Sequence, residues 1–354
     1  KVGSPWELDT QIGPLAVPLN HKLQKVLERE KARWLIKPKV QGQLMSPGVL
    51  WGVTPNDMEY QRELFGPILC VMKADDLKEA IALSNGVDFG LTSGLESLDE
   101  DEINTWKSLT HVGNLYINRS TTGAIVQRQP FGGLKSSCFG FGMKAGGMHY
   151  IKQFLKPDLS SFTYTESLPE KFKQWQAHLS EMEAQELGHA EKNYSESYFS
   201  HFSKEIDYAH IRGQYNLNRY LKPEKIVLCI DAQVGARDIT MVLGAADVMG
   251  LRVEVLATED TNYDDVFTKS GIHIHRLASW DDVETYLHHH IAIRALNKNR
   301  LPLSLLKKAH DKAIHIYGDA PVALGSFELL NYLTEQSISY SYHRYGNLMG
   351  KSES

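Results

Sequence analysis

The feature that most constrains the fold of this chain is a regular alternation of short apolar runs and helical patterns over residues 221–354. Residues 225–232 (KIVLCIDA) predict a strand, and residues 236–250 (ARDITMVLGAADVMG) predict a helix that ends at a glycine. The series continues with strands at 251–258, 272–277 and 313–319 and with a helix around 279–296. Elements of these lengths in alternation predict a small, Rossmann-like parallel α/β domain.

The first 155 residues show a similar alternation of short apolar runs and helical patterns. An apolar run at 65–74 precedes residues 75–86, which begin with two acids and stop at Asn-Gly, so a strand followed by a helix is expected. Residues 113–118 (GNLYIN) predict a buried strand. A strand, a helix and another strand in this order indicate α/β architecture.

The segment between these two regions, residues 156–220, is polar and rich in Glu, Lys, Gln and Ser, with scattered aromatic residues. We interpret it as a helical connector with one solvated face, interrupted at Gly188 and at an Asn/Ser cluster. A disordered linker is the alternative, but the aromatic residues favour a folded segment because their side chains can be buried in a core. The sequence thus predicts three parts: 1–155, 156–220 and 221–354.

Composition excludes several classes of protein. The 354 residues carry a formal net charge of -5 and no long basic run, which argues against nucleic-acid binding. No apolar run reaches the length of a membrane span, and residues 1–16 lack the apolar core of a signal peptide. The first residues, which lack an initiator Met, are typical of the middle of a protein, so we expect a fragment of a longer one.

Three cysteines, Cys70, Cys138 and Cys229, are widely spaced and form no C-x-x-C pair. Neither a disulfide framework nor a cysteine zinc site is indicated, and a reducing compartment fits this usage. The triplet His288–His290 falls in the predicted helix 279–296, where successive side chains point about 100° apart and do not converge on one ion. We therefore expect no metal.

Residues 242–250 (VLGAADVMG) loosely match a dinucleotide-binding loop. They fall inside the predicted helix at 236–250, whereas the fingerprint requires a position between a strand and a helix. Nothing else indicates that residues 221–354 bind NAD.

Two segments carry candidate binding residues. In QRELFGPIL (residues 61–69), Glu63 offers a carboxylate that suits adjacent ribose hydroxyls, and Phe65 offers an aromatic face. In STTGAIVQRQPFGG (residues 120–133), small residues precede Pro-Phe-Gly-Gly. Taken alone, the first motif is better explained as a surface Glu before a turn, and the second has an ordinary glycine-rich connector as its alternative.

Together with residues 113–147, these motifs resemble the aldehyde dehydrogenase superfamily, in which E-x-F-G-P is followed by G-x-x-x-x-N and P-F-G-G-x-K-x-S. The details TTGAIV and QPFGG narrow the resemblance to the L-glutamate γ-semialdehyde (1-pyrroline-5-carboxylate) dehydrogenases. The resemblance implies that residues 1–155 form the C-terminal portion of that catalytic unit.

The tail carries a second resemblance. Residues 211–223 (IRGQYNLNRYLKP) and 329–347 (LLNYLTEQSISYSYHRYGN) are similar to the C-terminal extension of long proline utilization A proteins, which join a proline dehydrogenase and an aldehyde dehydrogenase in one chain. In that family the extension is a degenerate copy of an aldehyde dehydrogenase nucleotide-binding fold. For residues 340–347 we expect strand addition to a neighbour, or packing back onto the catalytic unit.

The resemblance implies roles for particular residues. The backbone amides of Gly123 and Ala124 would bind the α-carboxylate of the substrate, and Phe131 would pack against its aliphatic carbons. Small side chains suit this role because they let the backbone approach a ligand, and consecutive amides form a nest for an anion. Glu63 would bind the nicotinamide ribose of NAD, and Phe65 would pack near the nicotinamide.

The implied reaction is NAD-dependent oxidation of L-glutamate γ-semialdehyde to L-glutamate through a cysteine thiohemiacetal and a thioester. The nucleophilic cysteine and the general-base Glu are expected upstream of this chain, because none of its three cysteines stands in a matching motif. FAD is implied only for an upstream proline dehydrogenase domain. The resemblance also implies a cytoplasmic homo-oligomer that contacts the upstream catalytic region of the same polypeptide.

A hypothesis of another class treats the chain as a non-catalytic lid or oligomerisation module. The missing nucleophile favours it, because the residues present then serve contacts rather than chemistry. Aldehyde oxidation by these 354 residues alone would rule it out.

Overall fold

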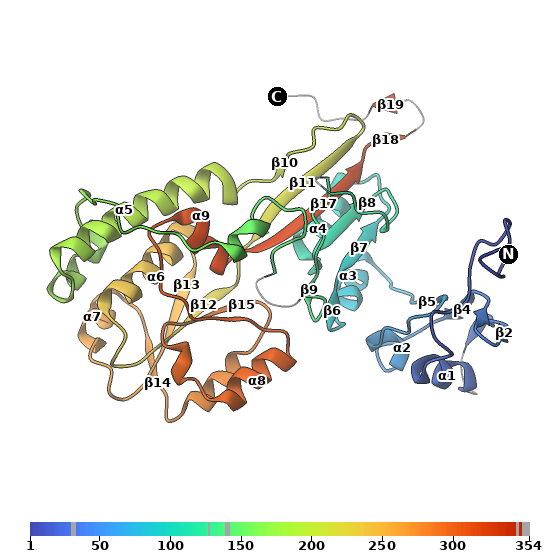
Figure 1. Cartoon of the computed structure of the whole chain (residues 1–354), viewed down its shortest axis with the longest axis horizontal. Coiled ribbons are helices and arrows are strands. Elements are labelled where there is room, and N and C mark those ends of the chain that lie inside the picture. Colours follow the sequence, from blue (N-terminus) through green and yellow to red (C-terminus); the bar gives the residue numbers. More distant parts are fainter. Residues whose placement is uncertain (30–32, 127, 139–141, 345–346, 349–354) are drawn as a thin grey trace. The chain divides into compact units, whose positions relative to one another are not determined.

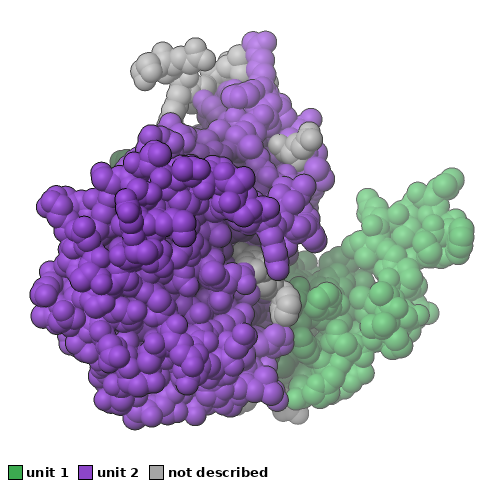
Figure 2. Space-filling view, turned by 60° about the vertical axis from the view of Figure 1, so that its left-hand side comes forward, with its two compact units in different colours: residues 1–88, 100–110 green, residues 89–99, 111–354 purple. Residues whose placement is uncertain are grey.

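A computed structural model of the chain describes residues 1–29, 33–126, 128–138, 142–344 and 347–348. The described residues form two compact units, coloured separately in Figure 2. Unit 1 contains residues 1–88 and 100–110, and unit 2 contains residues 89–99 and 111–354. In the described part of the chain, no helix has the length and apolar character needed to cross a membrane.

Unit 1 is built on a three-stranded sheet of order β1-β4-β5, in which β1 runs antiparallel to β4 and β5 runs parallel to it. Its strands are β1 (Trp34–Ile36), β2 (Val40–Gln41), β3 (Leu44–Met45), β4 (Gly48–Trp51) and β5 (Ile68–Val71). Its helices are α1 (His21–Glu28), α2 (Met58–Gln61), α3 (Leu77–Asn85) and α4 (Glu100–Leu109). The predicted strand within 65–74 and the predicted helix within 75–86 are thus confirmed as β5 and α3.

Local chemistry explains the limits of α3. Its N-cap residue, Asp76, accepts a hydrogen bond from the Glu79 amide at 2.8 Å, and so satisfies one of the free donors of the first turn. The helix ends at Gly86, whose own amide donates to the Ala82 carbonyl at 3.0 Å. A small apolar core of unit 1 lies between α1 and strands β3 and β4. Its buried members are Leu23, Val26, Met45, Leu50, Val53 and Leu64.

Unit 2 contains two five-stranded sheets, and Figure 1 labels all of their strands except β16. The first has the order β10-β11-β17-β8-β7 and joins strands that are far apart in the sequence. Its members are β7 (Thr92–Leu95), β8 (Asn114–Ile117), β10 (Ile206–Asp207), β11 (Gln214–Leu221) and β17 (Thr334–Ser341). Strand β8 is buried along its whole length, which confirms the buried strand predicted at 113–118.

Strand β17 lies between β11 and β8. Ile338 stands opposite Leu217 in the antiparallel pair with β11 and opposite Leu115 in the parallel pair with β8. The two tail motifs at 211–223 and 329–347 therefore form neighbouring strands, although Tyr345 and Gly346 lie outside the described residues. Of residues 340–347, for which packing back onto the catalytic unit is one expectation, Tyr340 pairs with Ile117 of β8. Residues 343–344 instead pair with residues 347–348, and for the rest of the segment the expectation stays a prediction.

The second sheet of unit 2 is entirely parallel, with the order β14-β13-β12-β15-β16. Its strands are β12 (Lys225–Ile230), β13 (Arg252–Ala257), β14 (Ile274–Arg276), β15 (Ile291–Ala295) and β16 (Ile316–Tyr317). Residues 226–230 are all buried, as expected for a central strand covered on both faces. The Rossmann-like parallel domain predicted from the alternation is thus confirmed.

The remaining elements of unit 2 connect or cover these sheets. The α-helices are α5 (Glu181–Ser197), α6 (Ala236–Met249), α7 (Asp264–Lys269), α8 (Leu303–Asp311) and α9 (Gly325–Glu328). The 3₁₀ helices are η1 (Tyr150–Phe154), η2 (Glu170–His178), η4 (Trp280–Tyr286), η5 (Lys298–Arg300) and η6 (Leu329–Asn331), and η3 (Tyr198–Phe202) is a π-helical turn. Short strand pairs are β6 (Phe89–Gly90) with β9 (Leu134–Lys135), and β18 (His343–Arg344) with β19 (Asn347–Leu348).

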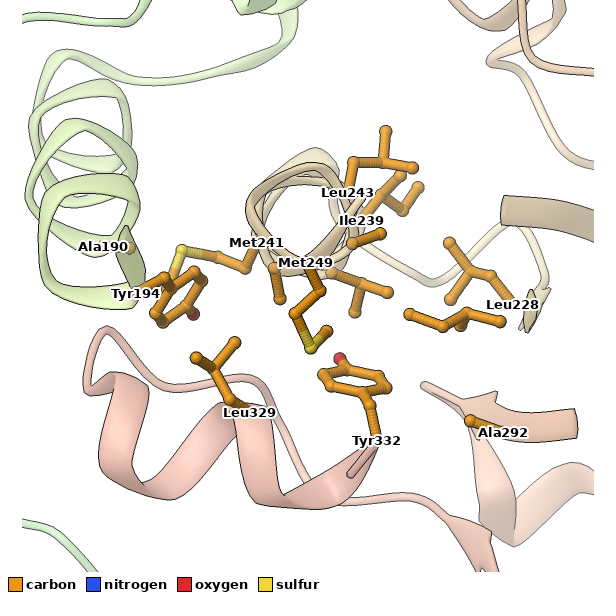
Figure 3. Close-up of a cluster of buried hydrophobic side chains, with 14 of the residues drawn as sticks. Ala190, Tyr194, Leu228, Ile239, Met241, Leu243, Met249, Ala292, Leu329 and Tyr332 are labelled. Carbon is orange, nitrogen blue, oxygen red and sulfur yellow. The ribbon is translucent and has the colours of Figure 1, made fainter. Parts of the chain in front are cut away.

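An extensive apolar core among the described residues lies around α6. Figure 3 shows side chains from α5, α6 and η6 converging, among them Tyr194, Met241 and Leu329. Tyr194 is fully buried, and its hydroxyl donates to the Val322 carbonyl at 2.6 Å. The aromatic residues of the connector are therefore core residues, and the helical interpretation of that segment holds over η2, α5 and η3.

Three details of the sequence interpretation are wrong. Neither Gly188 nor the start of the Asn/Ser cluster at Asn193 and Ser195 interrupts a helix, because α5 runs through both from Glu181 to Ser197. The end of the connector forms strands β10 and β11 rather than helix. The helix expected around 279–296 is the short η4 followed by a turn and by β15, because parallel pairing with β12 buries that apolar run as a strand.

Gly188 and Gly244 are glycines inside neighbouring helices, and we predict opposite effects when each is replaced by alanine. A Cβ at Gly188 would lie 2.4 Å from the Ser167 carbonyl oxygen, whereas a Cβ at Gly244 would meet the Leu187 side chain at an ordinary 3.6 Å. Gly188→Ala is expected to lower the free energy of unfolding by about 1–3 kcal/mol. Gly244→Ala is expected to raise it by about 0.5–1 kcal/mol through helix propensity.

Urea denaturation of both variants measures these changes. Equal changes in the free energy of unfolding would show that the close approach of the Ser167 carbonyl does not require glycine at position 188.

Candidate functional site

The candidate binding loop of unit 2 begins where β8 ends. Asn118 follows the strand with a left-handed backbone (φ 55°). Its side-chain amide donates to the Ser97 carbonyl at 2.8 Å, and its side-chain oxygen accepts from the Ser97 amide at 3.0 Å. Asn tolerates this backbone conformation better than most residues, so the sequence itself sets the point at which the chain leaves the sheet.

The loop exposes Gly123 and Ala124. Gly123 has φ 77°, and a Cβ there would have no neighbour within 4 Å. The backbone conformation, not crowding, therefore favours glycine at this position. Among the residues that the structure describes, no group accepts a hydrogen bond from the amide of Gly123 or of Ala124. Both donors are thus free to bind a ligand.

The other end of the loop is fixed at Phe131. Its amide donates to the Ala145 carbonyl at 3.0 Å, and the Ala145 amide donates back at 3.1 Å. The Phe131 ring remains 39% exposed. An aromatic side chain on a fixed backbone, open on one side, suits contact with an aliphatic chain. Residues 139–141, which belong to the same sequence motif, lie outside the described residues.

Lys144 supports this end of the loop and was missed by the sequence analysis. Its ammonium group is buried and donates to the Gly132 carbonyl and to the Asn114 side-chain oxygen, the latter at 3.3 Å. Burial lowers the pKa of Lys144 to about 8, although the nearby Glu335 carboxylate opposes this shift. The Lys144 amide also donates to Glu335, a residue of β17, at 3.2 Å.

Gln129 is a second residue that sequence reasoning missed. It is 2% exposed, and its side-chain oxygen accepts from the Ile125 amide at 2.9 Å. The sequence next to Pro-Phe-Gly-Gly does not indicate whether a polar residue there is buried or exposed. Its partners lie on β11 and β17, more than 80 residues away along the chain.

The candidate cofactor segment lies in unit 1. Leu64 is buried, and its carbonyl accepts from the Asn20 side chain at 2.9 Å. On either side of it, Glu63 and Phe65 are exposed. Phe65 has a left-handed backbone (φ 52°) and is 73% exposed, which is a strained conformation for an aromatic residue that gains little burial. Such strain is commonly associated with binding sites.

The five predicted site residues therefore fall in two groups. Gly123, Ala124 and Phe131 share one loop of unit 2, and Glu63 and Phe65 share one segment of unit 1. A single site formed by both segments stays a prediction.

The three cysteines occupy different environments. Burial raises the pKa of the Cys229 thiol to about 12, and burial together with Glu59 raises that of Cys70 on β5. Thiols of raised pKa are poor nucleophiles at neutral pH. Cys138 is partly buried in the turn after β9.

The histidine triplet lies in a different place from the one predicted. His288–His290 belong to the turn before β15, so the helical argument against a metal site rested on a wrong premise. In the described ranges, no group of three or more His, Cys, Asp or Glu residues is arranged to hold a metal ion. His290 instead packs against His111, with ring centroids 4.4 Å apart.

The first part of this chain is similar to a known class of enzyme. Residues 1–158 match the model of the aldehyde dehydrogenase family. The segment contains all five predicted site residues.

Particular relatives are more informative. The chain is 36% identical over 157 residues to the 1-pyrroline-5-carboxylate dehydrogenase of Bacillus licheniformis, which covers 43% of this chain and 30% of that protein. It is 35% identical over 156 residues to the enzyme of the same name from Bacillus subtilis, with 42% and 30% covered. The chain thus spans less than a third of the length of these relatives.

One solved structure resembles nearly the whole chain. Proline utilization A from Corynebacterium freiburgense is 31% identical, with a TM-score of 0.74, over 98% of this chain and 33% of that protein. The similarity therefore includes the tail strands β11 and β17 and the parallel sheet, which the family model does not reach.

Lys144 generates a prediction about pH. Its pKa is lower in the folded chain, about 8, than its ordinary value of 10.5, so between these values the unfolded chain binds more protons. The contribution of Lys144 to stability therefore rises as pH rises through this window. We expect the free energy of unfolding of the native chain, relative to Lys144→Met, to increase by about 2 kcal/mol from pH 7.5 to 9.5.

Denaturant titrations at both pH values test this, with the exposed Lys307→Met as the matched control. The control is expected to show no such pH-dependent difference. A difference between native chain and Lys144→Met that does not change with pH would contradict the buried-amine interpretation.

Proposed function

We propose that this chain forms part of an NAD-dependent dehydrogenase that oxidises L-glutamate γ-semialdehyde to L-glutamate. The observation that carries the proposal is the loop with two adjacent unengaged amides, at Gly123 and Ala124, inside a segment that matches the aldehyde dehydrogenase family. Relatives named 1-pyrroline-5-carboxylate dehydrogenase support this choice of substrate.

The loop would recognise the amino-acid end of the substrate. A left-handed residue in a loop turns neighbouring amides toward one side, and such amides form a concave site for an anion. Gly123 has this conformation, and the open space around it leaves room for a carboxylate. Phe131, fixed by its two bonds to Ala145, would contact the methylene groups between the carboxylate and the aldehyde.

Binding at this remote end would serve the chemistry. An aldehyde whose other end is held has fewer orientations to lose before reaction, so the free energy of carboxylate binding is expressed as a faster chemical step. An aldehyde without the carboxylate would bind the same active site without this gain. The substrate preference of the enzyme would therefore be determined largely by the loop of residues 120–133.

The cofactor would contact unit 1. The Glu63 carboxylate is exposed and, among the described residues, forms no ion pair, so it is free to accept hydrogen bonds from two adjacent ribose hydroxyls. The exposed ring of Phe65 would pack near the nicotinamide. When bound, NAD supplies the acceptor for the hydride that leaves the aldehyde carbon. The two side chains would hold that acceptor in one orientation.

The proposal includes further partners. The cysteine nucleophile and the general-base Glu would belong to an upstream region of the same polypeptide, and the protein would be a cytoplasmic homo-oligomer. A run of exposed apolar side chains near η1 supports contacts with further protein, because several large apolar groups are rarely left together in water. Its members are Met148, Tyr150, Ile151, Phe154 and Leu155.

The carboxylate-binding role predicts the behaviour of Ala124→Trp in the complete polypeptide that contains these residues. The new side chain would cover the two amides, so KM for the semialdehyde and the inhibition constant of L-glutamate should each rise at least about tenfold, the loss of one or two charge-assisted hydrogen bonds. Turnover of propanal, which has no carboxylate, should stay within about twofold. Steady-state kinetics with both aldehydes measures this.

Val126→Trp is the matched control, since Val126 is exposed in the same loop but offers no proposed contact. An equal loss with both aldehydes in Ala124→Trp would contradict the proposed recognition of the carboxylate.

The cofactor role predicts the behaviour of Glu63→Gln. The neutral amide keeps the shape of the side chain but is a weaker acceptor, so the dissociation constant of NAD should rise about fivefold to fiftyfold. Equilibrium titration with NAD, followed by quenching of the protein fluorescence, measures this without turnover. The inhibition constant of L-glutamate should not change. An unchanged NAD affinity would remove Glu63 from the proposed site.

A further inference from the structure

The exposed part of the candidate loop is held by one buried side chain. The Ile125 amide, which follows Ala124 directly, donates to the side-chain oxygen of Gln129 at 2.9 Å. The Gln129 amide in turn donates to the Ile125 carbonyl at 2.9 Å. Because the Ile125 N–H shares a peptide plane with the Ala124 carbonyl, this contact restricts the backbone rotation of Ala124. It therefore acts on the backbone that presents the two unengaged amides.

Gln129 is itself fixed by the tail of the chain. Its side-chain nitrogen donates to the Asn216 side-chain oxygen on β11 and to the Ser339 hydroxyl on β17, both at 2.9 Å. The Ser339 hydroxyl donates to Asn216 at 3.1 Å and accepts from the Arg119 guanidinium at 2.7 Å. Both side-chain donors of Gln129 and its oxygen thus have partners.

The burial of this network makes it specific. Gln129, Asn216 and Ser339 are 2%, 3% and 1% exposed, so water offers no easy substitute for a lost partner. A buried amide that loses one bond leaves a polar group unsatisfied, which strongly favours the single arrangement that is complete. The network therefore determines one position of the Gln129 side chain, and through it the position of the Ile125 backbone amide.

Strand β17 holds the loop at a second point as well. The Ser337 hydroxyl donates to the Pro130 carbonyl at 2.6 Å. Ser337 and Ser339 lie two positions apart, so their side chains point to the same face of the strand. Two serines of one strand thus contact the loop at Gln129 and Pro130, next to Phe131.

We propose that Gln129 is a positioning residue for substrate binding, and that Asn216 and Ser339 act through it to keep the amides of Gly123 and Ala124 in a conformation that accepts a carboxylate. The inference rests on the proposed function of the loop. It assigns a part in substrate specificity to two residues that lie outside the family-matching residues 1–158.

The test compares Gln129→Met and Ser339→Ala with Ser341→Ala, a matched serine of β17, in the complete polypeptide that contains these residues. Hydrogen exchange of the peptide covering Ile125 reads the contact directly. Exchange is expected to be faster than in the native chain in Gln129→Met. The acceleration should be smaller in Ser339→Ala, and Ser341→Ala should exchange at the native rate. The inhibition constant of L-glutamate should rise about fivefold in Gln129→Met, as for one lost hydrogen bond, while propanal turnover stays within about twofold.

Ala124→Trp is measured in parallel, so that the two proposals can fail separately. Unchanged exchange at Ile125 in Gln129→Met overturns the proposed restraint. Faster exchange with an unchanged inhibition constant overturns the positioning role if Ala124→Trp still weakens L-glutamate binding. If Ala124→Trp also leaves L-glutamate binding unchanged, the loop does not bind the carboxylate, and the positioning role falls with it. Ser339→Ala keeps the test decisive if Gln129→Met does not fold.

Discussion

The structure of unit 2 depends on one pairing: strand β17, close to the end of the chain, lies between β8 and β11. On one side its backbone pairs in parallel with β8, a strand of the aldehyde dehydrogenase segment, and on the other it pairs antiparallel with β11. Without β17, each neighbour would present an unpaired backbone edge in the interior of the sheet. Strands β11 and β17 of the tail therefore share one sheet with β7 and β8 of the family-matching segment.

This pairing has consequences for the candidate loop, since the side chains of β17 are directed by its register. Ser337 and Ser339 contact the loop at Pro130 and Gln129, Gln336 donates to the Val112 carbonyl at 2.7 Å, and Glu335 accepts from the Lys144 amide. A one-residue slip would turn these side chains to the opposite face of the sheet. The register of β17 thus fixes the loop at Gln129 and Pro130, and Lys144 completes the support beneath Gly132.

The buried polar residues beside the loop have a clear physical role. Lys144, Glu335, Gln129 and Asn216 are all buried, and apolar residues there would pack well without specifying one loop conformation. Hydrogen-bonded networks are directional, so each member accepts only one arrangement of its partners. Burial shifts the pKa of Lys144 downward and that of Glu335 upward, which shows that the charged forms are held at some expense of stability. We connect this cost in stability with the loop of residues 120–133, for which we propose carboxylate binding by the backbone.

Local sequence determined the elements with strong periodic patterns and clear ends: β8, α3, α6 with its terminal Gly250, and the parallel strands β12 and β13. It also indicated the family, because Glu63, Phe65 and the loop of residues 120–133 are contiguous motifs. Tertiary structure alone decided what depends on distant contacts. Position 188 inside α5 requires glycine because the Ser167 carbonyl passes close to it, and the run at 291–295 is a strand because β12 lies beside it. Gln129 and Lys144 gain their roles from residues of β11 and β17 that lie far away in the chain, and no pattern within either residue's own neighbourhood carries that information.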